Sequence, residues 1–188
     1  MSDERPHVHI ESVAELRAWL DDNHGTSDGV WIVAWKKDRG PYVSWGEIVP
    51  ELLAYGWIDS KAGSFDEDRR KLTITPRNPK SAWSRRNKEI IATLEAERRM
   101  APAGAAMVAL AKETGTWTEL DEVEALIEPA ELATALDADP AARANWDAFP
   151  RSAKRFALLH LHTAKREETR AKRVAEIATK AARNERVG

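Results

Sequence analysis

The sequence predicts an α+β fold: a small, mainly antiparallel sheet with flanking helices, followed by a C-terminal helical lobe. Residues 30–35 (VWIVAW) form a short, β-prone and almost wholly apolar run, as expected of a buried central strand. Residues 57–65 and 70–75 flank a polar turn, which predicts a β-hairpin. Beyond residue 84, apolar residues recur at helical spacing, so the rest of the chain is expected to be helical.

Two capping boxes predict two helices in the first part of the chain, one on each side of the central strand. Ser12 with Glu15 begins the first helix, because each residue can satisfy a free backbone N–H of the other. Ser44 with Glu47 begins the second in the same way, and Gly56 supplies the left-handed residue that ends it.

The second half of the chain is expected to hold a succession of helices. They are predicted to begin at or near Ser84, Pro102, Pro129, Pro140, Ser152 and Glu167. A change of character near Trp117 divides the chain into an α+β lobe at 1–117 and a helical lobe at 118–188.

Alternation along the hairpin predicts which side chains share a face of the sheet. One set is expected to face the core: Ile58, Ser60, Ala62, Leu72 and Ile74. The other set is expected on the opposite face: Trp57, Asp59, Lys61, Lys71, Thr73 and Thr75. The second set is too polar for a core and, with a tryptophan, too aromatic for an ordinary solvent-exposed surface. It is therefore interpreted as part of a ligand-binding site.

Composition limits the classes of protein to consider. With 188 residues and 43% apolar residues, the chain can bury a core. It contains no cysteine, which excludes disulfides, thiolate metal sites and a cysteine nucleophile. The N-terminus lacks the apolar run of a signal peptide, and no window approaches the roughly 18 apolar residues of a membrane span. We therefore expect a cytoplasmic protein without a membrane span.

The formal net charge of -2 hides strong segregation of charge along the chain. Residues 69–89 carry eight bases and one acid, residues 119–139 carry eight acids and no base, and the chain is basic again from Arg151. Blocks of opposite sign can neutralise each other inside the protein, or a basic block can present a face to an anionic partner.

Ten residues on the hairpin and in the loop after it form a candidate ligand-binding site. They are Trp57, Asp59, Lys61, Thr75, Arg77, Lys80, Ser81, Trp83, Ser84 and Asn87. Two indoles would sandwich a flat group, while Arg77 and Lys80 would hold a carboxylate or phosphate beside the helix N-terminus at Ser84. The predicted ligand is therefore a small anionic or aromatic molecule. In the alternative interpretation, Asp59 pairs with Arg77 or Lys61 and the tryptophans cover the sheet.

Catalysis is the second hypothesis, with Asp59 as general acid or base of a hydrolase- or transferase-like enzyme. The surrounding cations would lower the pKa of Asp59, and the sequence offers it no second carboxylate nearby. Binding is therefore predicted in preference to catalysis, and no catalytic residue is assigned otherwise.

Other cofactors and partners are predicted from less specific signals. His160 and His162 are two residues apart on a helix, whereas metal pairs need a spacing of three or four, so neither a metal nor a cofactor is predicted. Bases interleaved with Trp57 and Trp83 suit an interaction module for nucleic acid, although the acidic residues 119–139 argue against it. A protein partner and the oligomeric state are left open by the sequence.

Several runs of residues together resemble a known family. They are GVWIVAWKK at 29–37, YGWIDSK at 55–61, TPRNPKSAWSRRNK at 75–88, MAPAG at 100–104 and SAKRFALLHLHTAKREETRAKRVAEI at 152–177. These runs are similar to the bacterial YdeI/OmpD-associated family, also called bacteriocin-protection proteins. The resemblance implies a link to tolerance of cationic antimicrobial peptides and to an outer-membrane porin. It implies no catalytic residue and no ligand.

Overall fold

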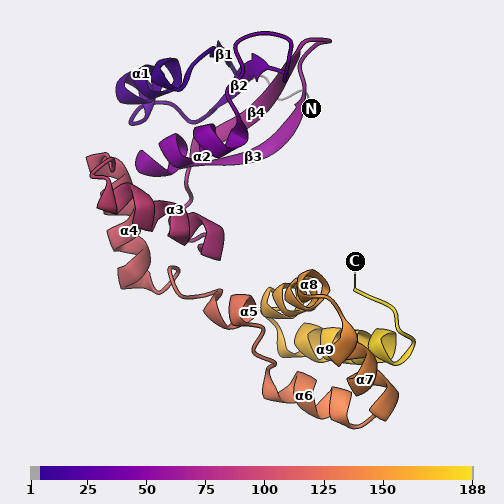
Figure 1. Ribbon diagram of the computed structural model, residues 1–188. Coiled ribbons are helices and arrows are strands. Elements are labelled where there is room, and N and C mark those ends of the chain that lie inside the picture. Colours follow the sequence, from indigo (N-terminus) through magenta and orange to yellow (C-terminus); the bar gives the residue numbers. More distant parts are fainter. Residues whose placement is uncertain (1–4, 188) are drawn as a thin grey trace. The chain divides into compact units, whose positions relative to one another are not determined.

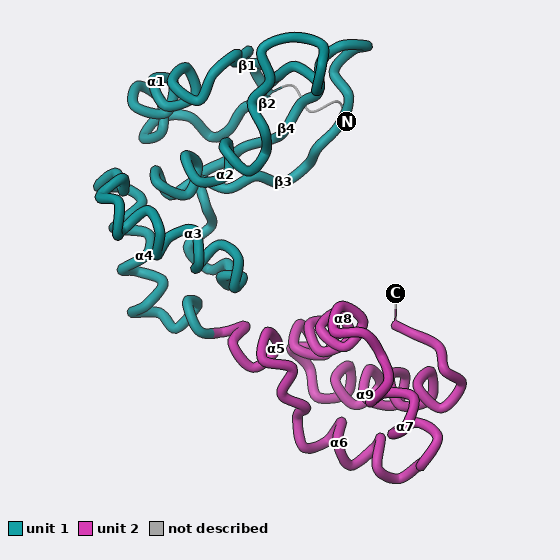
Figure 2. Tube along the Cα trace, viewed as in Figure 1, with its two compact units in different colours: residues 1–118 teal, residues 119–188 magenta. Residues whose placement is uncertain are grey.

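The computed structural model describes residues 5–187 and divides the chain into two compact units. Unit 1 is Met1–Thr118 and unit 2 is Glu119–Gly188 (Figure 2). Unit 1 combines a four-stranded sheet with helices, and unit 2 is helical. The predicted α+β class with a small sheet is confirmed.

The sheet of unit 1 has the strand order β1-β2-β4-β3. Its strands are β1 (His7–His9), β2 (Val30–Trp35), β3 (Trp57–Ser64) and β4 (Arg69–Pro76). The β2–β4 and β3–β4 pairings are antiparallel, while β1 runs parallel to β2. The sheet is therefore mixed: mainly antiparallel, as predicted, with one parallel edge strand.

Four helices of unit 1 begin where the sequence provides a cap or a proline. They are α1 (Val13–Asn23), α2 (Trp45–Ala54), α3 (Arg85–Ala96) and α4 (Pro102–Thr114). The backbone N–H of Glu15 donates to the Ser12 hydroxyl at 3.2 Å, and that of Ser44 donates to the Glu47 carboxylate at 2.8 Å. The Ser44–Glu47 capping box therefore forms as predicted. At the first helix Ser12 caps the helix as predicted, but the Glu15 carboxylate accepts the N–H of Glu11 at 2.8 Å in place of that of Ser12, so the reciprocal half of that box is not formed.

The core of unit 1 takes side chains from one face of the sheet and from α1 to α4, with α2 in contact with β3 and with the other three helices (Figure 1). Its members are fully or almost fully buried, among them Leu16, Leu20, Ile32, Ile48, Leu52, Leu53, Leu72, Ile74, Ile91 and Leu94. Helix α4 packs closely against the end of α2, because a Cβ on Gly104 would overlap the Ala54 carbonyl. The same carbonyl accepts the N–H of Ala101 at 3.0 Å.

Unit 2 is built from α5 (Asp121–Ala125), α6 (Ala130–Asp137), α7 (Pro140–Ala148), α8 (Arg151–His162) and α9 (Glu167–Ala182). Asp139 caps α7 by accepting the N–H of Ala141 at 2.8 Å. The buried side chains include Leu132, Leu136, Trp146, Leu158, Leu161, Val174 and Ile177. Helices α6 to α9 thus each contribute buried apolar side chains to a shared interior.

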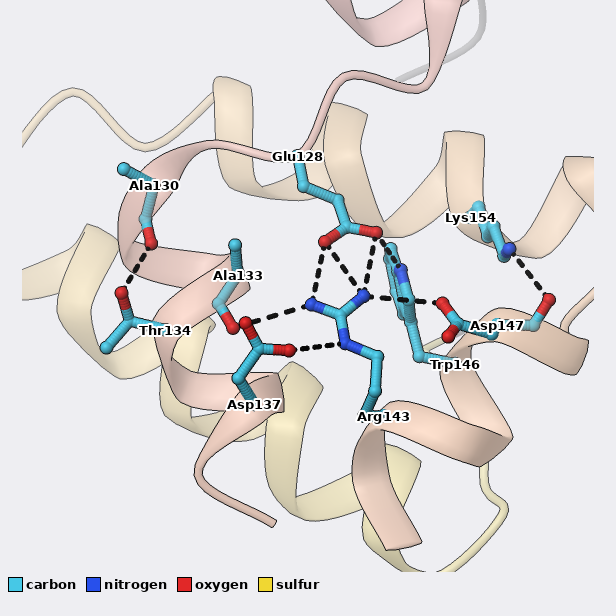
Figure 3. A network of polar contacts seen from close by, with 9 residues as sticks. All are labelled: Glu128, Ala130, Ala133, Thr134, Asp137, Arg143, Trp146, Asp147 and Lys154. Carbon is cyan, nitrogen blue, oxygen red and sulfur yellow. Dashed lines mark hydrogen bonds and ion pairs between the residues drawn. The ribbon is translucent and has the colours of Figure 1, made fainter. Parts of the chain in front are cut away.

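A network centred on Arg143 of α7 joins that helix to α6 and to the segment before α6 in unit 2 (Figure 3). The guanidinium binds Glu128 at 3.0 Å, Asp137 at 2.7 Å and Asp147 at 3.3 Å. The indole N–H of Trp146 donates to the same Glu128 carboxylate at 2.7 Å. Acids of residues 119–139 are therefore neutralised by bases later in the same unit, one of the two outcomes that the charge pattern allowed.

Two further findings concern the described part of the chain. None of the helices within residues 5–187 combines the length and apolar character needed to cross a membrane. Over the same residues, no group of three or more His, Cys, Asp or Glu side chains is arranged to hold a metal ion.

Candidate functional site

The loop that leaves β4 places Arg77 directly against Trp83. The Arg77 guanidinium carbon lies 3.9 Å from the centroid of the Trp83 ring, and Nη2 donates to the carbonyls of Ser81 at 3.2 Å and Ala82 at 2.6 Å. Trp83 also packs on Trp117, with ring centroids 5.0 Å apart. Only 5% of Arg77 and 1% of Trp83 are exposed, and this burial lowers the pKa of the Arg77 guanidinium. The two residues meet as predicted, but in the interior.

Trp57 is buried in another setting. It is 1% exposed, packs edge-to-face on Trp19 at 5.6 Å, and donates its indole N–H to the carbonyl of His24 at 3.2 Å. The predicted accessible hollow between Trp57, Trp83 and Arg77 is therefore not present in the described structure. Each indole has its own aromatic neighbour, and all three side chains are buried.

A β-bulge explains why regular alternation predicts the wrong face of the sheet, the one opposite the core, for Trp57 and Asp59. Trp57 lies opposite Pro76 and Asp59 opposite Ile74, but Ala62 lies opposite Leu72, so the register shifts between Asp59 and Ala62. Directly opposed residues share a face. Trp57 and Asp59 therefore lie on the core-facing side with Ile74, because the extra residue inverts the alternation. Ala62 lies opposite Leu72, as predicted, but it is exposed and does not contribute to the core.

The remaining residues of the predicted site are spread over the hairpin and the following loop. Lys61, Lys80 and Ser81 are exposed, while Asp59, Thr75, Ser84 and Asn87 are partly buried. Ser84 caps α3 by accepting the N–H of Asn87 at 3.3 Å, so both residues have a structural role. Within residues 5–187, no ion pair joins Asp59 to Arg77 or Lys61. The ligand-binding role of these ten residues stays a prediction.

The sheet face opposite the core, here called the outer face, gathers aromatic and basic side chains. We define it by His7, His9, Trp31, Val33, Trp35, Arg69, Lys71 and Thr73, which face away from the core residues Ile32, Ala34, Leu72 and Ile74. The register pairs Trp31 with Thr73, Val33 with Lys71 and Trp35 with Arg69. The placement of Lys71 and Thr73 on this face agrees with the predicted alternation.

Cations lie over the aromatic rings of the outer face. The Lys71 ammonium is 4.4 Å from the centroid of the Trp31 ring, within the range of a cation–π contact. The Arg69 guanidinium carbon is 5.0 Å from the Phe65 centroid, and Arg69 also pairs with Asp66 at 2.6 Å. Arg69 is thus neutralised by a carboxylate, whereas Lys71 lies against the Trp31 ring.

Trp31 and Thr73 each bury a polar atom that has no partner among the described residues. The indole Nε1 of Trp31 and the hydroxyl of Thr73 make no hydrogen bond, although Trp31 is 7% and Thr73 1% exposed. Leaving such a group unsatisfied costs about 1–3 kcal/mol. The two residues are direct cross-strand partners on the outer face, and the Lys71 ammonium lies over the ring of one of them, Trp31.

Sequence reasoning missed Trp31 because residues 30–35 read as uniformly buried. A partial signal was present: alternation along residues 30–35 places Trp31 and Trp35 on one face of the strand. What the sequence does not give is the β2–β4 register, which brings Trp31 opposite Thr73.

Comparison with known protein families gives two matches along the chain. Residues 8–107 match the family described as Domain of unknown function (DUF8412), and residues 125–184 match the family described as Bacteriocin-protection, YdeI or OmpD-Associated. No curated protein and no solved structure matches the chain. Trp31, Lys71 and Thr73 lie inside the first match, and helices α6 to α9 lie inside the second.

Proposed function

The chain belongs, through residues 8–107, to the family of the Domain of unknown function (DUF8412) and carries a Bacteriocin-protection, YdeI or OmpD-Associated domain at 125–184; we propose that it is a binding protein. Unit 1 would hold a small anionic aromatic ligand on the outer face of its sheet. The ligand class is the one expected from the sequence, but the proposed site lies at Trp31 and not at Trp57. The observation that carries the proposal is the Trp31–Thr73 pair with its two unused donors.

The chemistry of the pair points to an anion. An indole N–H can only donate, and a threonine hydroxyl can donate as well as accept. The Lys71 ammonium lies 4.4 Å from the centroid of the same indole ring, and Thr73 is the cross-strand partner of Trp31, so the three donor residues are neighbours on this face. A carboxylate or phosphate accepts from all three, and charge-assisted hydrogen bonds of this kind are the stronger ones.

The aromatic part of the ligand follows from the ring under Lys71. The ammonium lies over the indole, so a side-chain rotation would uncover the ring face and move the positive charge to its edge. A flat ligand ring would then stack on Trp31 in place of the ammonium, while its acidic group contacts Lys71. Lys71 would thus cover the empty site and bind the ligand in the occupied one.

The family description supports a cellular context for this binding. The match at residues 125–184 is described by bacteriocin protection, so we propose that ligand binding in the cytoplasm contributes to tolerance of antimicrobial peptides or envelope stress. A reaction at Asp59 has less support, because Asp59 shares the core-facing side with Ile74.

A single-stranded nucleic acid is the second candidate ligand. The observation that favours it is the row of aromatic rings with nearby cations on the outer face, since bases stack on such rings and phosphates bind such cations. Its binding would weaken steeply as salt rises, whereas a ligand with one acidic group would lose little.

The test is a titration of the full chain with phenyl phosphate, followed by the indole N–H signals in two-dimensional NMR spectra. We expect the Trp31 signal to shift, with weaker shifts for phenol or inorganic phosphate alone. Lys71→Met should reduce the affinity at least about tenfold, the equivalent of one charge-assisted contact of about 1.4 kcal/mol. The matched control is Lys112→Met, because Lys112 also lies over an indole, 5.1 Å from the Trp117 centroid, away from the sheet.

Thr73→Val separates a binding role from a packing role. Valine keeps the shape and removes a buried hydroxyl that has no partner, so the free protein should be as stable as the parent or slightly more stable. Binding of phenyl phosphate should nevertheless weaken. Equal affinity in Lys71→Met and Lys112→Met, or no shift at Trp31 in millimolar phenyl phosphate, would overturn the proposal.

A further inference from the structure

Unit 2 contains a hollow of about 500 Å³ between α6 and α9. It is lined by Glu131 and Ala135 of α6 and by Glu167, Arg170, Ala171, Val174 and Ala175 of α9. The volume falls within the roughly 300–1,000 Å³ of small-molecule sites. The hollow lies wholly inside the residues that match the Bacteriocin-protection, YdeI or OmpD-Associated family.

The lining combines an apolar floor with charged groups. Three alanines and Val174 provide the floor, and the small alanine side chains leave the space that larger residues would fill. Two carboxylates and one guanidinium provide the charges, so the lining carries one net negative charge. A mostly apolar surface with a few placed polar groups is the usual composition of a ligand site.

The three charged groups are not equivalent. Arg170 donates its Nε to Glu131 at 2.6 Å, and its Nη2 lies 2.5 Å from the same carboxylate. A backbone N–H, followed by the Arg170 contact, lowers the pKa of Glu131, so this carboxylate is ionised at neutral pH. Glu167 is exposed and forms no ion pair within the described residues. One carboxylate is therefore occupied by Arg170 and one is free.

Arg170 also borders a second, smaller hollow of about 60 Å³, which gives its guanidinium space on a second side. That hollow is lined by Glu122, Val123, Ile127, Pro129, Leu158 and His162 in addition to Arg170. A cation that enters the larger hollow would compete with Arg170 for Glu131. The guanidinium could then turn toward the side that contains Glu122, where it again meets a carboxylate.

We propose that the hollow between α6 and α9 binds a small organic cation with an apolar body. The ammonium or guanidinium of the ligand contacts Glu167 and Glu131, and its hydrocarbon part lies on Ala135, Ala171 and Val174. This ligand is opposite in charge to the one proposed for the outer face of unit 1. The two proposals rest on different residues, so an experiment can refute one and leave the other standing.

The experiment is calorimetric titration of the full chain with octylammonium chloride, with octanol and octanoate as comparison ligands. We expect octylammonium to bind more tightly than octanol and octanoate to bind least, because only the ammonium complements the carboxylates. Octanol bound as tightly as octylammonium would overturn the proposal, since the hollow would then select for hydrocarbon alone.

Variants with opposite expected effects sharpen the test. Glu167→Gln should weaken octylammonium binding about tenfold, the equivalent of one charge-assisted contact. Arg170→Gln should strengthen binding a few-fold, because it removes the internal competitor for Glu131. Ala171→Phe should abolish binding by filling the hollow, and the exposed position tolerates the larger side chain.

The matched control is Glu168→Gln. Glu168 is the next residue on the same helix, is exposed, and pairs with Lys172 at 2.7 Å outside the lining of the hollow. It changes the net charge of the protein as Glu167→Gln does, and should leave the affinity unchanged. An equal loss in both variants would show general charge attraction and contradict the site, as would retained binding in Ala171→Phe.

Discussion

The Arg77 guanidinium lies 3.9 Å from the centroid of the Trp83 ring, and both side chains are buried. Arg77 also donates to two carbonyls of its own loop, those of Ser81 and Ala82. These contacts fix the path of the chain between β4 and α3. The pair that the sequence offered as part of a ligand pocket therefore stabilises a loop against the core.

Arg77→Lys should lower the free energy of unfolding by about 2–3 kcal/mol. Lysine keeps the charge but cannot stack as a plane on Trp83 while donating to two carbonyls. Urea unfolding followed by circular dichroism measures the change. Lys80→Ala is the control in the same loop, because Lys80 is exposed and should change stability by less than about 0.5 kcal/mol. Similar stabilities for the two variants would contradict a structural role of Arg77.

Two helical glycines should respond to alanine with opposite signs. In α4, Gly104→Ala places a methyl group on the Ala54 carbonyl, so the helices must separate and the protein should lose about 2 kcal/mol or more. In α2, the nearest atom to a Cβ on Gly46 is the Ser44 hydroxyl at 3.7 Å. Gly46→Ala should therefore stabilise by up to about 1 kcal/mol. Thermal unfolding of both variants is the measurement, and a stable Gly104→Ala would rule out the close α2–α4 packing.

Glu51 is a buried carboxylate held by two arginines. Its side chain is 2% exposed and contacts Arg99 and, at 3.4 Å, Arg17, whose own side chains are 40% and 42% exposed. Because Arg99 makes the closer contact, Arg99→Ala should cost about 3 kcal/mol and Arg17→Ala about 1 kcal/mol of unfolding free energy.

Chemical denaturation of the two arginine variants tests this order. Arg86→Ala is a suitable control, since Arg86 is an exposed residue of α3 and its removal should be nearly neutral. If Arg17→Ala proves the more damaging change, the assignment of Arg99 as the main partner of Glu51 is wrong.

Acid should destabilise the protein through carboxylates in both units. Hydrogen bonds from Ser44 lower the pKa of Glu47, the Arg69 contact lowers that of Asp66, and Lys180 lowers that of Glu176. A lowered folded-state pKa adds stability that is present above the unfolded pKa, near 4, and lost as the pH falls through the folded pKa.

The melting temperature should therefore be nearly constant from pH 7 to about 5 and should fall below about pH 4. Thermal melting followed by circular dichroism at a series of pH values measures this decrease of the melting temperature in acid. Asp66→Asn should lower the melting temperature at pH 7 and make the decrease in acid smaller. An unchanged melting temperature down to pH 3 would contradict the prediction.

Local signals in the sequence predicted much of the fold. The caps at Ser12 and Ser84 and the capping box at Ser44 depend on residues only three positions apart, so they can be read without knowing the tertiary structure. The hairpin and the central strand were found from alternation and β propensity in the same way. The parallel strand β1 has only three residues, too few for a periodic signal, and it depends on pairing with distant residues 31–33.

The candidate site was harder to predict because it depends on register. Alternation placed Lys71 and Thr73 correctly, but the bulge between Asp59 and Ala62 inverted the positions of Trp57 and Asp59. The partner of Thr73 proved to be Trp31, 42 positions earlier in the chain. Neither the bulge nor the β2–β4 register can be recognised from the local composition. The sequence therefore predicted Trp57 as the aromatic residue of this face, where the structure has Trp31.

The bulge also has a consequence for the evolution of this hairpin. Between the Asp59–Ile74 and Ala62–Leu72 pairs, β3 has one residue more than β4 requires. Loss of that residue would leave the pairing of both flanking segments intact, because the regular ladder resumes on either side. Insertions and deletions among relatives should therefore concentrate at Ser60 and Lys61, while the lengths of β2 and β4 stay constant.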